Sequence, residues 1–509
     1  MLAKIYTAAL VGLNAKIIEV EVDVFRGERR ISIVGLPDKA VNESKDRIMS
    51  AFKNSGIFLG PGNKVINLAP ADLPKIGPAY DLPMAIGLLV ASGEIKHFNS
   101  EGKLFVGELA LDGAVRAVKG VLAIIDSMKD QGFNEFFIPR ENLKEASVVE
   151  GIKIFPLDNI KQLTGHFSGS FISSDNTLLH STPASSEFEH DFCNIKGQFK
   201  AKRALEIAAA GGHNVLFCGV PGSGKSYMAK AFPSILPRMT FKESIEVTRI
   251  YSVAGKLDSG SSLINTRPFR DPHHSASLSA LIGGGTVPHP GEISLAHRGV
   301  LFLDEFTEFD PQVIESLRQP MEDKTVTISR ATTSSIFPCN FQLIAAMNPC
   351  PCGFFGDQDR NCSCSEYDRA RYKRKISGPI LDRIDLYLYI PRVKYNLLSS
   401  NEEAENSSVI RERVQFARDI QTARFNVSFK DEDTLCNADI SQKALRRFID
   451  VDVNGRELLS RAVKTISMSA RGYFKLLKVA KTIADLESAK IITEKHISEA
   501  LSFRMEFQR

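Results

Sequence analysis

The sequence predicts an α/β fold: a parallel sheet that carries a phosphate-binding loop, with an α+β domain before it and helices after it. Residues 219–226 read Gly-x-x-x-x-Gly-Lys-Ser and lie between a short apolar run and a segment that can start a helix. Residues 300–303 and 341–347 are further apolar runs, as expected for strands that a parallel sheet buries on both faces. After residue 408 the spacing is helical to the end of the chain.

The chain of 509 residues is long enough for about two to four domains. We expect an α+β domain at 1–165, a linker at 166–191, the phosphate-loop core at 192–395 with a cysteine-rich loop at 350–364, and a helical domain at 396–509. The linker is rich in Ser, Thr and Pro and has little periodicity.

Composition excludes some classes of protein. A net charge of +4 is too small to indicate a nucleic-acid partner, so any such site must be a local patch. No apolar run is long enough to span a bilayer, and the first residues lack the apolar core of a signal peptide. We therefore expect a cytoplasmic protein without a membrane partner. Eight cysteines in so long a chain do not make a disulfide framework.

Periodicity predicts the elements of the first domain. Residues 15–24 alternate apolar and charged side chains, which is typical of an antiparallel strand with one exposed face. Further strands are expected at 31–36, 65–68, 105–108 and 136–139, and a buried helix at 81–90. A helix capped by Asp38 and ended by Gly56 should have one face made of Val41, Ser44, Ile48, Ala51 and Phe52.

The phosphate loop predicts a nucleotide site. Its glycines let the backbone turn tightly, so that several N–H groups point at one phosphate. Lys225 would reach the outer phosphates, and the Ser226 hydroxyl would bind Mg²⁺. With the acidic residue discussed next, the residues expected to bind ATP and Mg²⁺ are Gly219, Val220, Pro221, Gly222, Ser223, Gly224, Lys225, Ser226 and Asp304.

Polar residues follow the other two apolar runs. Asp304 would hold Mg²⁺ through water, and Glu305 would orient and deprotonate the attacking water. Asn348 would hydrogen-bond that water or the γ-phosphate, although by itself an Asn before a Pro is also typical of a turn. Phosphate loop, acidic strand and Asn-tipped strand, in this order, resemble the layout of AAA+ ATPases.

In these ring motors ATP lies between subunits, and an arginine of one subunit stabilises the charge transferred in the next. Residues 377–386 resemble the arginine-finger segment of magnesium-chelatase and replicative-helicase AAA+ proteins, which implies that role for Arg383. Residues 469–472 resemble the sensor motif of the helical lid in the same group, which implies that Arg471 lies over the γ-phosphate.

Two insertions are similar to elements that project into the ring pore of related motors. One contains Arg-Pro-Phe-Arg-Asp-Pro-His-His at 267–274, and the other is a hairpin at 325–337 with Arg330 near its tip. Basic side chains there would hold DNA phosphates without reading sequence, and the candidates are Arg267, Arg270, Lys324 and Arg330. His273 and His274 either bind a metal or, as we expect, pack within the insertion.

Four cysteines form two Cys-x-Cys pairs that bracket nine residues rich in Gly and Asp. Four thiolates can bind a tetrahedral Zn²⁺ in a loop with too few apolar residues to fold alone. We favour structural zinc, with free thiols or an iron–sulfur cluster as alternatives. The expected ligands are Cys350, Cys352, Cys362 and Cys364.

The first domain resembles the proteolytic domain of Lon proteases through residues 77–79, 106–109, 115–120 and 138–142. That family uses a Ser–Lys pair, and this chain has Ala79 and Ile124 at the corresponding positions. Without a nucleophile and its base there is no acyl transfer. We therefore expect a protease-like fold that acts in assembly or partner binding.

The whole chain resembles the magnesium-chelatase-like AAA+ ATPases of ComM/YifB type. This resemblance implies an ATP-hydrolysing hexameric ring that translocates on single-stranded or branched DNA. It implies helicase and branch-migration activity in homologous recombination, notably of DNA taken up in natural transformation. The alternatives are a magnesium-chelatase subunit, an ATP-dependent protease and an ATP-gated scaffold. The Lon-like domain and cysteine loop argue against the first, Ala79 and Ile124 against the second, and Glu305 against the third.

Overall fold

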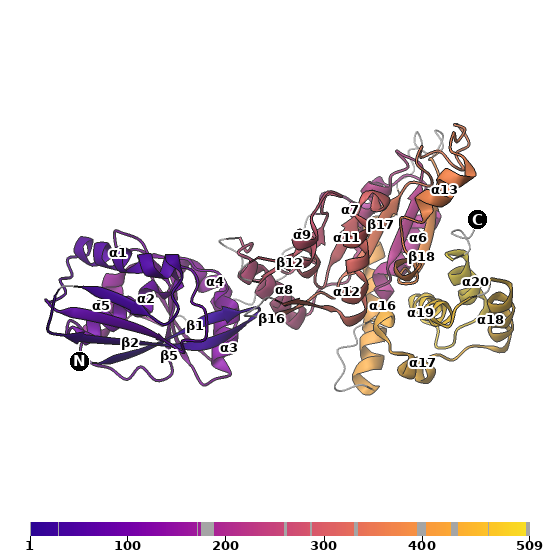
Figure 1. The fold of residues 1–509 in the computed structure, drawn as a ribbon. Coiled ribbons are helices and arrows are strands. Elements are labelled where there is room, and N and C mark those ends of the chain that lie inside the picture. The colour runs from indigo at the N-terminus through magenta and orange to yellow at the C-terminus, as the bar shows by residue number, and fades with distance from the viewer. Residues whose placement is uncertain are drawn as a thin grey trace. The chain divides into compact units, whose positions relative to one another are not determined.

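The fold comes from a computed structural model, which describes residues 2–28, 30–170, 172–174, 188–258, 262–285, 288–329, 334–393, 404–428, 436–466 and 468–504 (Figure 1). The chain forms two compact units. Unit 1 contains Met1–Ala184, Phe241–Ile264 and Ser329–Ile336. Unit 2 contains Ser185–Thr240, Asn265–Ile328 and Phe337–Arg509. The predicted domain boundaries stay predictions, although helix α5 (Ile160–Ser168) extends into the expected linker.

The first sheet of unit 1 has the order β1 (Ala3–Val11), β2 (Asn14–Phe25), β4 (Asn63–Ala69), β3 (Ile31–Val34). The pairs β1–β2 and β2–β4 are antiparallel, and β3 runs parallel to β4. Side chains of β2 alternate between buried and more exposed, which confirms the predicted strand with one exposed face. Helices α2 (Asp81–Ala91) and α3 (Val121–Lys129) both pack on this sheet.

Helix α1 (Lys39–Asn54) begins where the sequence predicts. Asp38 caps it by accepting a hydrogen bond from the Val41 N–H at 2.7 Å. Its buried face is the predicted set of five residues. Unit 1 also has a parallel three-stranded sheet of β5 (Lys103–Phe105), β8 (Glu135–Pro139) and β9 (Lys153–Leu157), a hairpin of β6 (Glu108–Leu109) and β7 (Val115–Arg116), and α4 (Leu143–Ala146).

Helix α8 (Phe241–Ala254) belongs to unit 1, although it follows the phosphate loop in the chain. It packs against α3. The Ser252 hydroxyl donates to the buried Glu145 carboxylate at 2.6 Å, and Arg249 donates to Asp126 at 2.8 Å.

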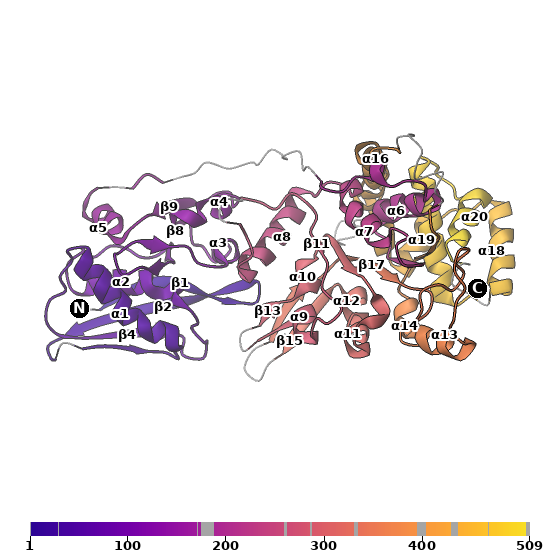
Figure 2. The same cartoon turned by 90° about the horizontal axis from the view of Figure 1, so that it is seen from above.

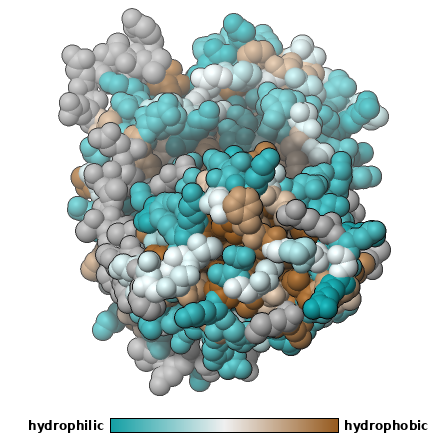
Figure 3. Space-filling view, turned by 90° about the vertical axis from the view of Figure 1, so that its left-hand side faces the viewer, coloured by the Kyte–Doolittle hydropathy of each residue, from teal (hydrophilic) through white to brown (hydrophobic). Residues whose placement is uncertain are grey.

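Figure 3 shows the face on the left of Figure 1, where a hydrophobic area is surrounded by mostly hydrophilic residues.

Unit 2 is built on a five-stranded sheet whose neighbouring strands all pair in parallel. Its order is β11 (Phe269–Arg270), β14 (Val300–Leu303), β17 (Gln342–Met347), β10 (Val215–Gly219), β18 (Leu386–Ile390). Every residue of β14 and β17 is buried, which confirms the predicted parallel sheet. Because all strands run the same way, the residues that follow β10, β14 and β17 leave the sheet at one edge.

The C-terminal helices are α16 (Ser407–Ser428), α17 (Gln442–Phe448), α18 (Val453–Ile466), α19 (Ala470–Leu486) and α20 (Glu494–Ser502) (Figure 2). Val414, Ala417 and Gln421 of α16 are buried, as the spacing predicts. Helices α16 and α19 pack on α6 (Phe199–Gly211), and one hydrophobic core joins these helices to the sheet. The protein therefore has the helical region that the sequence predicts.

Shorter elements complete unit 2. The first insertion forms α9 (Leu278–Ile282), the strand pair β12 (Gly283–Gly284) and β13 (His289–Pro290), and α10 (Glu292–Leu295). The second forms the hairpin β15 (Thr325–Ser329) and β16 (Ser334–Pro338), whose last strand begins in unit 1. Further α-helices among the described residues are α7 (Lys225–Ala231), α11 (Pro311–Ser316), α12 (Arg318–Asp323), α13 (Glu366–Lys373) and α14 (Gly378–Leu381).

Candidate nucleotide-binding site

The phosphate loop joins β10 to α7, as predicted. Gly222 and Gly224 have φ of 76° and 90°, a left-handed conformation that side chains with a Cβ rarely adopt. The two glycines therefore allow the tight turn that directs loop N–H groups toward a phosphate.

The Lys225 side chain is buried at the loop. Its Nζ donates to the carbonyl oxygens of Gly219 at 2.7 Å and Val220 at 3.0 Å, and it lies 3.3 Å from Asn348 Oδ1. Burial lowers the pKa of Lys225, although the Asp304 charge acts the other way. The ammonium group is thus held at the loop by neutral oxygen atoms, which a negatively charged phosphate can replace.

Ser226 and Asp304 lie next to each other. The Ser226 hydroxyl donates to Asp304 Oδ2 at 2.5 Å, although 78 residues separate them in the chain. A hydroxyl and a carboxylate are hard oxygen ligands of the kind that Mg²⁺ prefers. These two residues fit the predicted magnesium site, and the metal would supply charge stabilisation at the phosphates when bound.

Glu305 follows Asp304 at the end of β14. Its N–H donates to Asp304 Oδ1 at 2.9 Å, and its φ is 51°. Its carboxylate Oε2 lies 3.2 Å from Nδ1 of His274. The structure therefore brings Lys225, Ser226, Asp304, Glu305 and Asn348 to the same edge of the sheet through three separate strands.

Arg383 and Arg471 form a second group. Both guanidinium groups bind the carboxylate of Glu322 in α12, Arg383 at 2.6 Å. The side chain of Arg383 is 4% exposed and also donates to the carbonyl oxygen of Pro379 at 2.5 Å. Although partial burial of Glu322 acts the other way, hydrogen bonds from the two arginines lower its pKa. The predicted catalytic roles of both arginines stay predictions.

The candidate DNA-binding residues make contacts inside unit 2. Arg267 donates to the carbonyl oxygens of Pro237, Arg238 and Arg298, and Arg270 forms a two-pronged ion pair with Glu292 at 2.5 and 2.8 Å. Lys324 binds Asp439. Arg330 lies outside the described residues. These contacts fix the insertions in place, and DNA binding by the same residues stays a prediction.

The four cysteines form one cluster. The Sγ atoms of Cys350, Cys352 and Cys362 are 3.3 to 3.6 Å apart, and Cys364 Sγ lies with them within 4.8 Å. A tetrahedral zinc with Zn–S bonds of about 2.3 Å separates its sulfur atoms by about 3.8 Å. The Cys352 N–H also donates to Cys364 Sγ at 3.4 Å. The spacing and the donor set therefore fit a metal held by four thiolates.

Ala79 and Ile124 lie in one hydrophobic cluster of unit 1. Ile124 is 2% exposed, and Ala79 packs against the cluster that contains it. Aliphatic side chains there supply neither a nucleophile nor a base. The Lon-like character of the domain stays a prediction.

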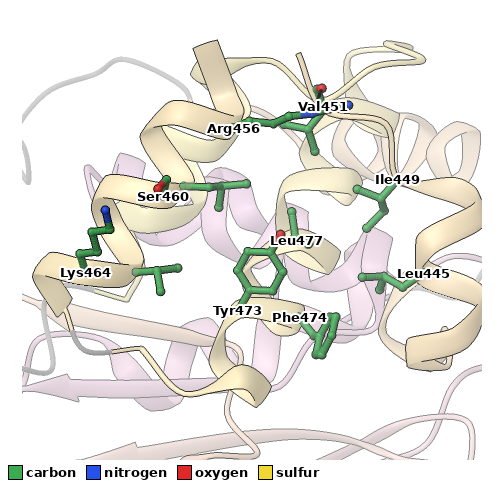
Figure 4. Close-up of a pocket in the computed structure, with 11 residues that line it drawn as sticks. Leu445, Ile449, Val451, Arg456, Ser460, Lys464, Tyr473, Phe474 and Leu477 are labelled. Carbon is green, nitrogen blue, oxygen red and sulfur yellow. Dashed lines mark hydrogen bonds between the residues drawn. The ribbon is translucent and has the colours of Figure 1, made fainter. Parts of the chain in front are cut away.

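A cavity of about 630 Å³ lies among α17, α18 and α19 (Figure 4). Its lining is largely apolar, with Leu445, Leu477 and Phe474 from the helices and the Tyr473 ring beside them. None of the predicted site residues lines it. The cavity is a feature of the helical region that is separate from the phosphate loop.

Two contacts of the site were not foreseen from the sequence. Glu322 was not singled out, because one acidic residue in a polar helix gives no signal of the two arginines that converge on it. His274 was expected to pack within the insertion, but it contacts Glu305. The signal for this contact was the short distance along the chain between His274 and β11, the neighbour of β14 in the sheet.

Three family models match the chain: magnesium chelatase, subunit ChlI, at residues 191–398; subunit ChlI of Mg-chelatase at 20–142; and magnesium chelatase, subunit ChlI C-terminal, at 404–504. The chain is 39% identical to the uncharacterized protein YifB of Escherichia coli (strain K12), over 99% of this chain and 97% of that protein. It is also 39% identical, over the same shares, to competence protein ComM of Haemophilus influenzae.

The chain belongs to the magnesium-chelatase-like ComM/YifB family. It is also 24% identical to DNA replication licensing factor mcm2 of Xenopus laevis, over 59% of this chain and 31% of that protein. The family and the parallel sheet together establish the predicted AAA+ fold. Among the described residues, no helix is both long enough and apolar enough to cross a membrane.

Proposed function

We propose that this family member is an ATP-driven motor that acts on DNA as an oligomeric ring, most simply a hexamer. The observation that carries the ATPase part is the meeting of Lys225, Ser226, Asp304, Glu305 and Asn348 at one sheet edge. In this proposal Lys225 binds the outer phosphates, and Ser226 and Asp304 hold Mg²⁺. Glu305 takes a proton from the attacking water, and Asn348 orients that water or the γ-phosphate.

Action on DNA is supported by the relatives. One is named a competence protein and another a DNA replication licensing factor. We propose that the substrate is single-stranded or branched DNA and that the activity is branch migration or unwinding during recombination, with natural transformation as the setting. A motor that holds phosphates through basic side chains should bind less tightly as salt rises.

The test is the ATPase rate with and without forked DNA, with particle mass measured on the same sample. We expect Mg²⁺-dependent hydrolysis that DNA stimulates and that salt weakens. Lys225→Ala should abolish hydrolysis, and Glu305→Gln should abolish hydrolysis but still bind ATP. An intact Glu305→Gln rate would exclude the proposed chemistry, and equal rates with and without DNA would exclude the proposed substrate.

We further propose that Arg383 acts on ATP bound to a neighbouring subunit. In this chain Arg383 is paired with Glu322, so that pair must open when the neighbour binds. Mixing Arg383→Ala chains with Glu305→Gln chains should restore some hydrolysis, because some interfaces then combine an intact Glu305 with an intact Arg383. No recovery in mixed particles would place Arg383 in a structural role.

The second candidate is a magnesium-chelatase-type ATPase subunit, which the three matched family models favour. A chelatase motor would hydrolyse ATP without any response to DNA. The same ATPase comparison therefore separates the two candidates.

We also propose that the four-cysteine cluster holds a structural Zn²⁺, which fits its sulfur spacing.

A further inference from the structure

The segment that follows β11 runs along the sheet edge where the proposed catalytic carboxylates lie. Strand β11 pairs in parallel with β14, with Phe269 opposite Val300 and Arg270 opposite Leu301. Parallel neighbours end at the same edge, so Asp271 and His274 come beside Asp304 and Glu305. Burial raises the pKa of Asp271, and the positive charge of Lys230 opposes this effect. The negative charge of Asp304 raises this pKa further, as expected for two neighbouring carboxylates.

This segment is anchored at both ends. Before it, Arg270 forms the two-pronged ion pair with Glu292 of α10. After it, Ser277 caps α9 by accepting a hydrogen bond from the Ala280 N–H at 3.2 Å. The loop that carries His274 is therefore placed by contacts that do not involve Glu305.

The two adjacent histidines have different contacts. His274 Nδ1 lies 3.2 Å from Glu305 Oε2, which is an ion-pair distance when the imidazole is protonated. His273 Nδ1 lies 2.8 Å from the Ser275 hydroxyl, and its ring packs on that of His274 with the centroids 4.1 Å apart, so its contacts stay within its own loop. Of the two, His274 is the one that reaches the carboxylate of the proposed general base.

The main chain of Glu305 is fixed, but its side chain needs a further restraint. A left-handed φ of 51° at a residue other than Gly is strained and persists only where the surrounding structure holds it. The Glu305 side chain is 55% exposed and has three rotatable bonds. The contact with the His274 imidazole limits the positions that its carboxylate can take.

We propose that His274 is a positioning residue for Glu305, which holds Oε2 so that Oε1 points to the attacking water. This inference rests on the proposed ATPase function. A carboxylate can accept hydrogen bonds at both oxygens, so the His274 contact leaves Oε1 able to take a proton. As Glu305 takes that proton, the water oxygen bonds to the γ-phosphorus. The bond from that phosphorus to the bridging oxygen breaks, giving ADP and phosphate.

The arrangement follows the general pattern in which a catalytic base is oriented by a third group. His274 and Glu305 are 37% and 55% exposed, and exposed pairs contribute little to stability. Substitution of His274 should therefore leave folding and ATP binding intact and act on turnover alone.

The experiment compares His274→Ala, His274→Asn and the matched control His273→Ala for ATPase kinetics and for binding of a fluorescent ATP analogue. A general base typically increases the rate of the chemical step about 10²–10⁴-fold. We expect His274→Ala to remove part of this increase, so that kcat falls about tenfold while the KM for ATP is unchanged. His274→Asn should recover part of the loss, because its amide N–H lies near the position of Nδ1. His273→Ala should lose much less than His274→Ala, because it removes only a ring that packs on His274.

A second comparison tests whether His274 acts through Glu305. In single-turnover reactions, His274→Ala should slow wild type but add nothing to Glu305→Gln. A wild-type kcat for His274→Ala, a change in KM alone, or an equal loss in the Glu305→Gln background would overturn the inference. If the wild-type protein does not hydrolyse ATP, or Glu305→Gln hydrolyses it at the wild-type rate, the proposed function itself fails.

Discussion

Lys225 Nζ lies 3.3 Å from Asn348 Oδ1, so the end of β17 contacts the phosphate-loop lysine. Replacing Asn348 by Ala should lower kcat about 10²-fold, because a fixed polar group near the reacting phosphate is lost. Affinity for a fluorescent ATP analogue should stay near wild type, since the loop itself is unchanged. An unchanged kcat would show that the Asn348 amide only holds the Lys225 side chain and has no role in hydrolysis.

Glu322→Ala should destabilise unit 2. The carboxylate neutralises Arg383, whose side chain is 4% exposed, and its loss leaves a buried cation that is hydrogen-bonded to the Pro379 carbonyl oxygen but has lost its ion-pair partner. Allowing for the 45% exposure of Glu322, we expect a loss of roughly 2 kcal/mol, measured by thermal or urea unfolding. The control is Glu308→Ala, which removes an exposed partner of Lys375 and should change little. Equal effects of the two variants would contradict this account.

Acid should destabilise unit 2 through His213. This side chain is fully buried, its Nε2 lies 2.8 Å from the Thr482 hydroxyl, and burial lowers its pKa to about 4. The unfolded chain, with an ordinary histidine pKa near 6.5, binds the proton first as pH falls. Stability should therefore drop between pH 6.5 and 4, by roughly 3 kcal/mol from this group.

The test of this pH effect is urea unfolding at several pH values for wild type, His213→Gln and the exposed control His289→Gln. The slope of stability against pH should become shallower in His213→Gln only. A parallel loss of slope in the control variant, or none in either, would count against the neutral buried histidine.

Removal of zinc should weaken nucleotide binding. A Cβ placed on Gly353, inside the cysteine loop, would lie 2.8 Å from Cγ of Pro221, so this loop touches the phosphate loop. Metal analysis should find about one zinc per chain, and Cys350→Ser/Cys362→Ser should lose it together with affinity for ATP. Undiminished zinc in the double variant would exclude these ligands, and Cys193→Ser is a matched control outside the cluster.

Local patterns in the sequence predict most of the sheet and helix positions. An apolar run with a polar end identifies each of three places in the sequence: the phosphate loop, β14 and β17. Such buried runs predict strands of a parallel sheet, as the structure has them. A few neighbouring residues likewise predict the Asp38 cap and the buried α16 face made of Val414, Ala417 and Gln421. These features depend on interactions close along the chain.

What the sequence did not reveal depends on distant partners. Glu322 is one carboxylate among many until the fold brings Arg383 and Arg471 to it. The place of α8 in unit 1 is set by Ser252 and Arg249, which bind residues more than 100 positions away. No periodicity within a helix identifies such a partner.

Because α8 belongs to unit 1, cutting the chain between residues 184 and 185 would not yield unit 2 alone. Such a truncation would retain residues 241–264 without α3, the helix on which α8 rests, while Val247, Ile250 and Val253 of α8 are buried in the whole chain. Exposed apolar surface of this kind favours aggregation. A shortened chain for biochemical work should therefore replace residues 241–264 by a short polar connector.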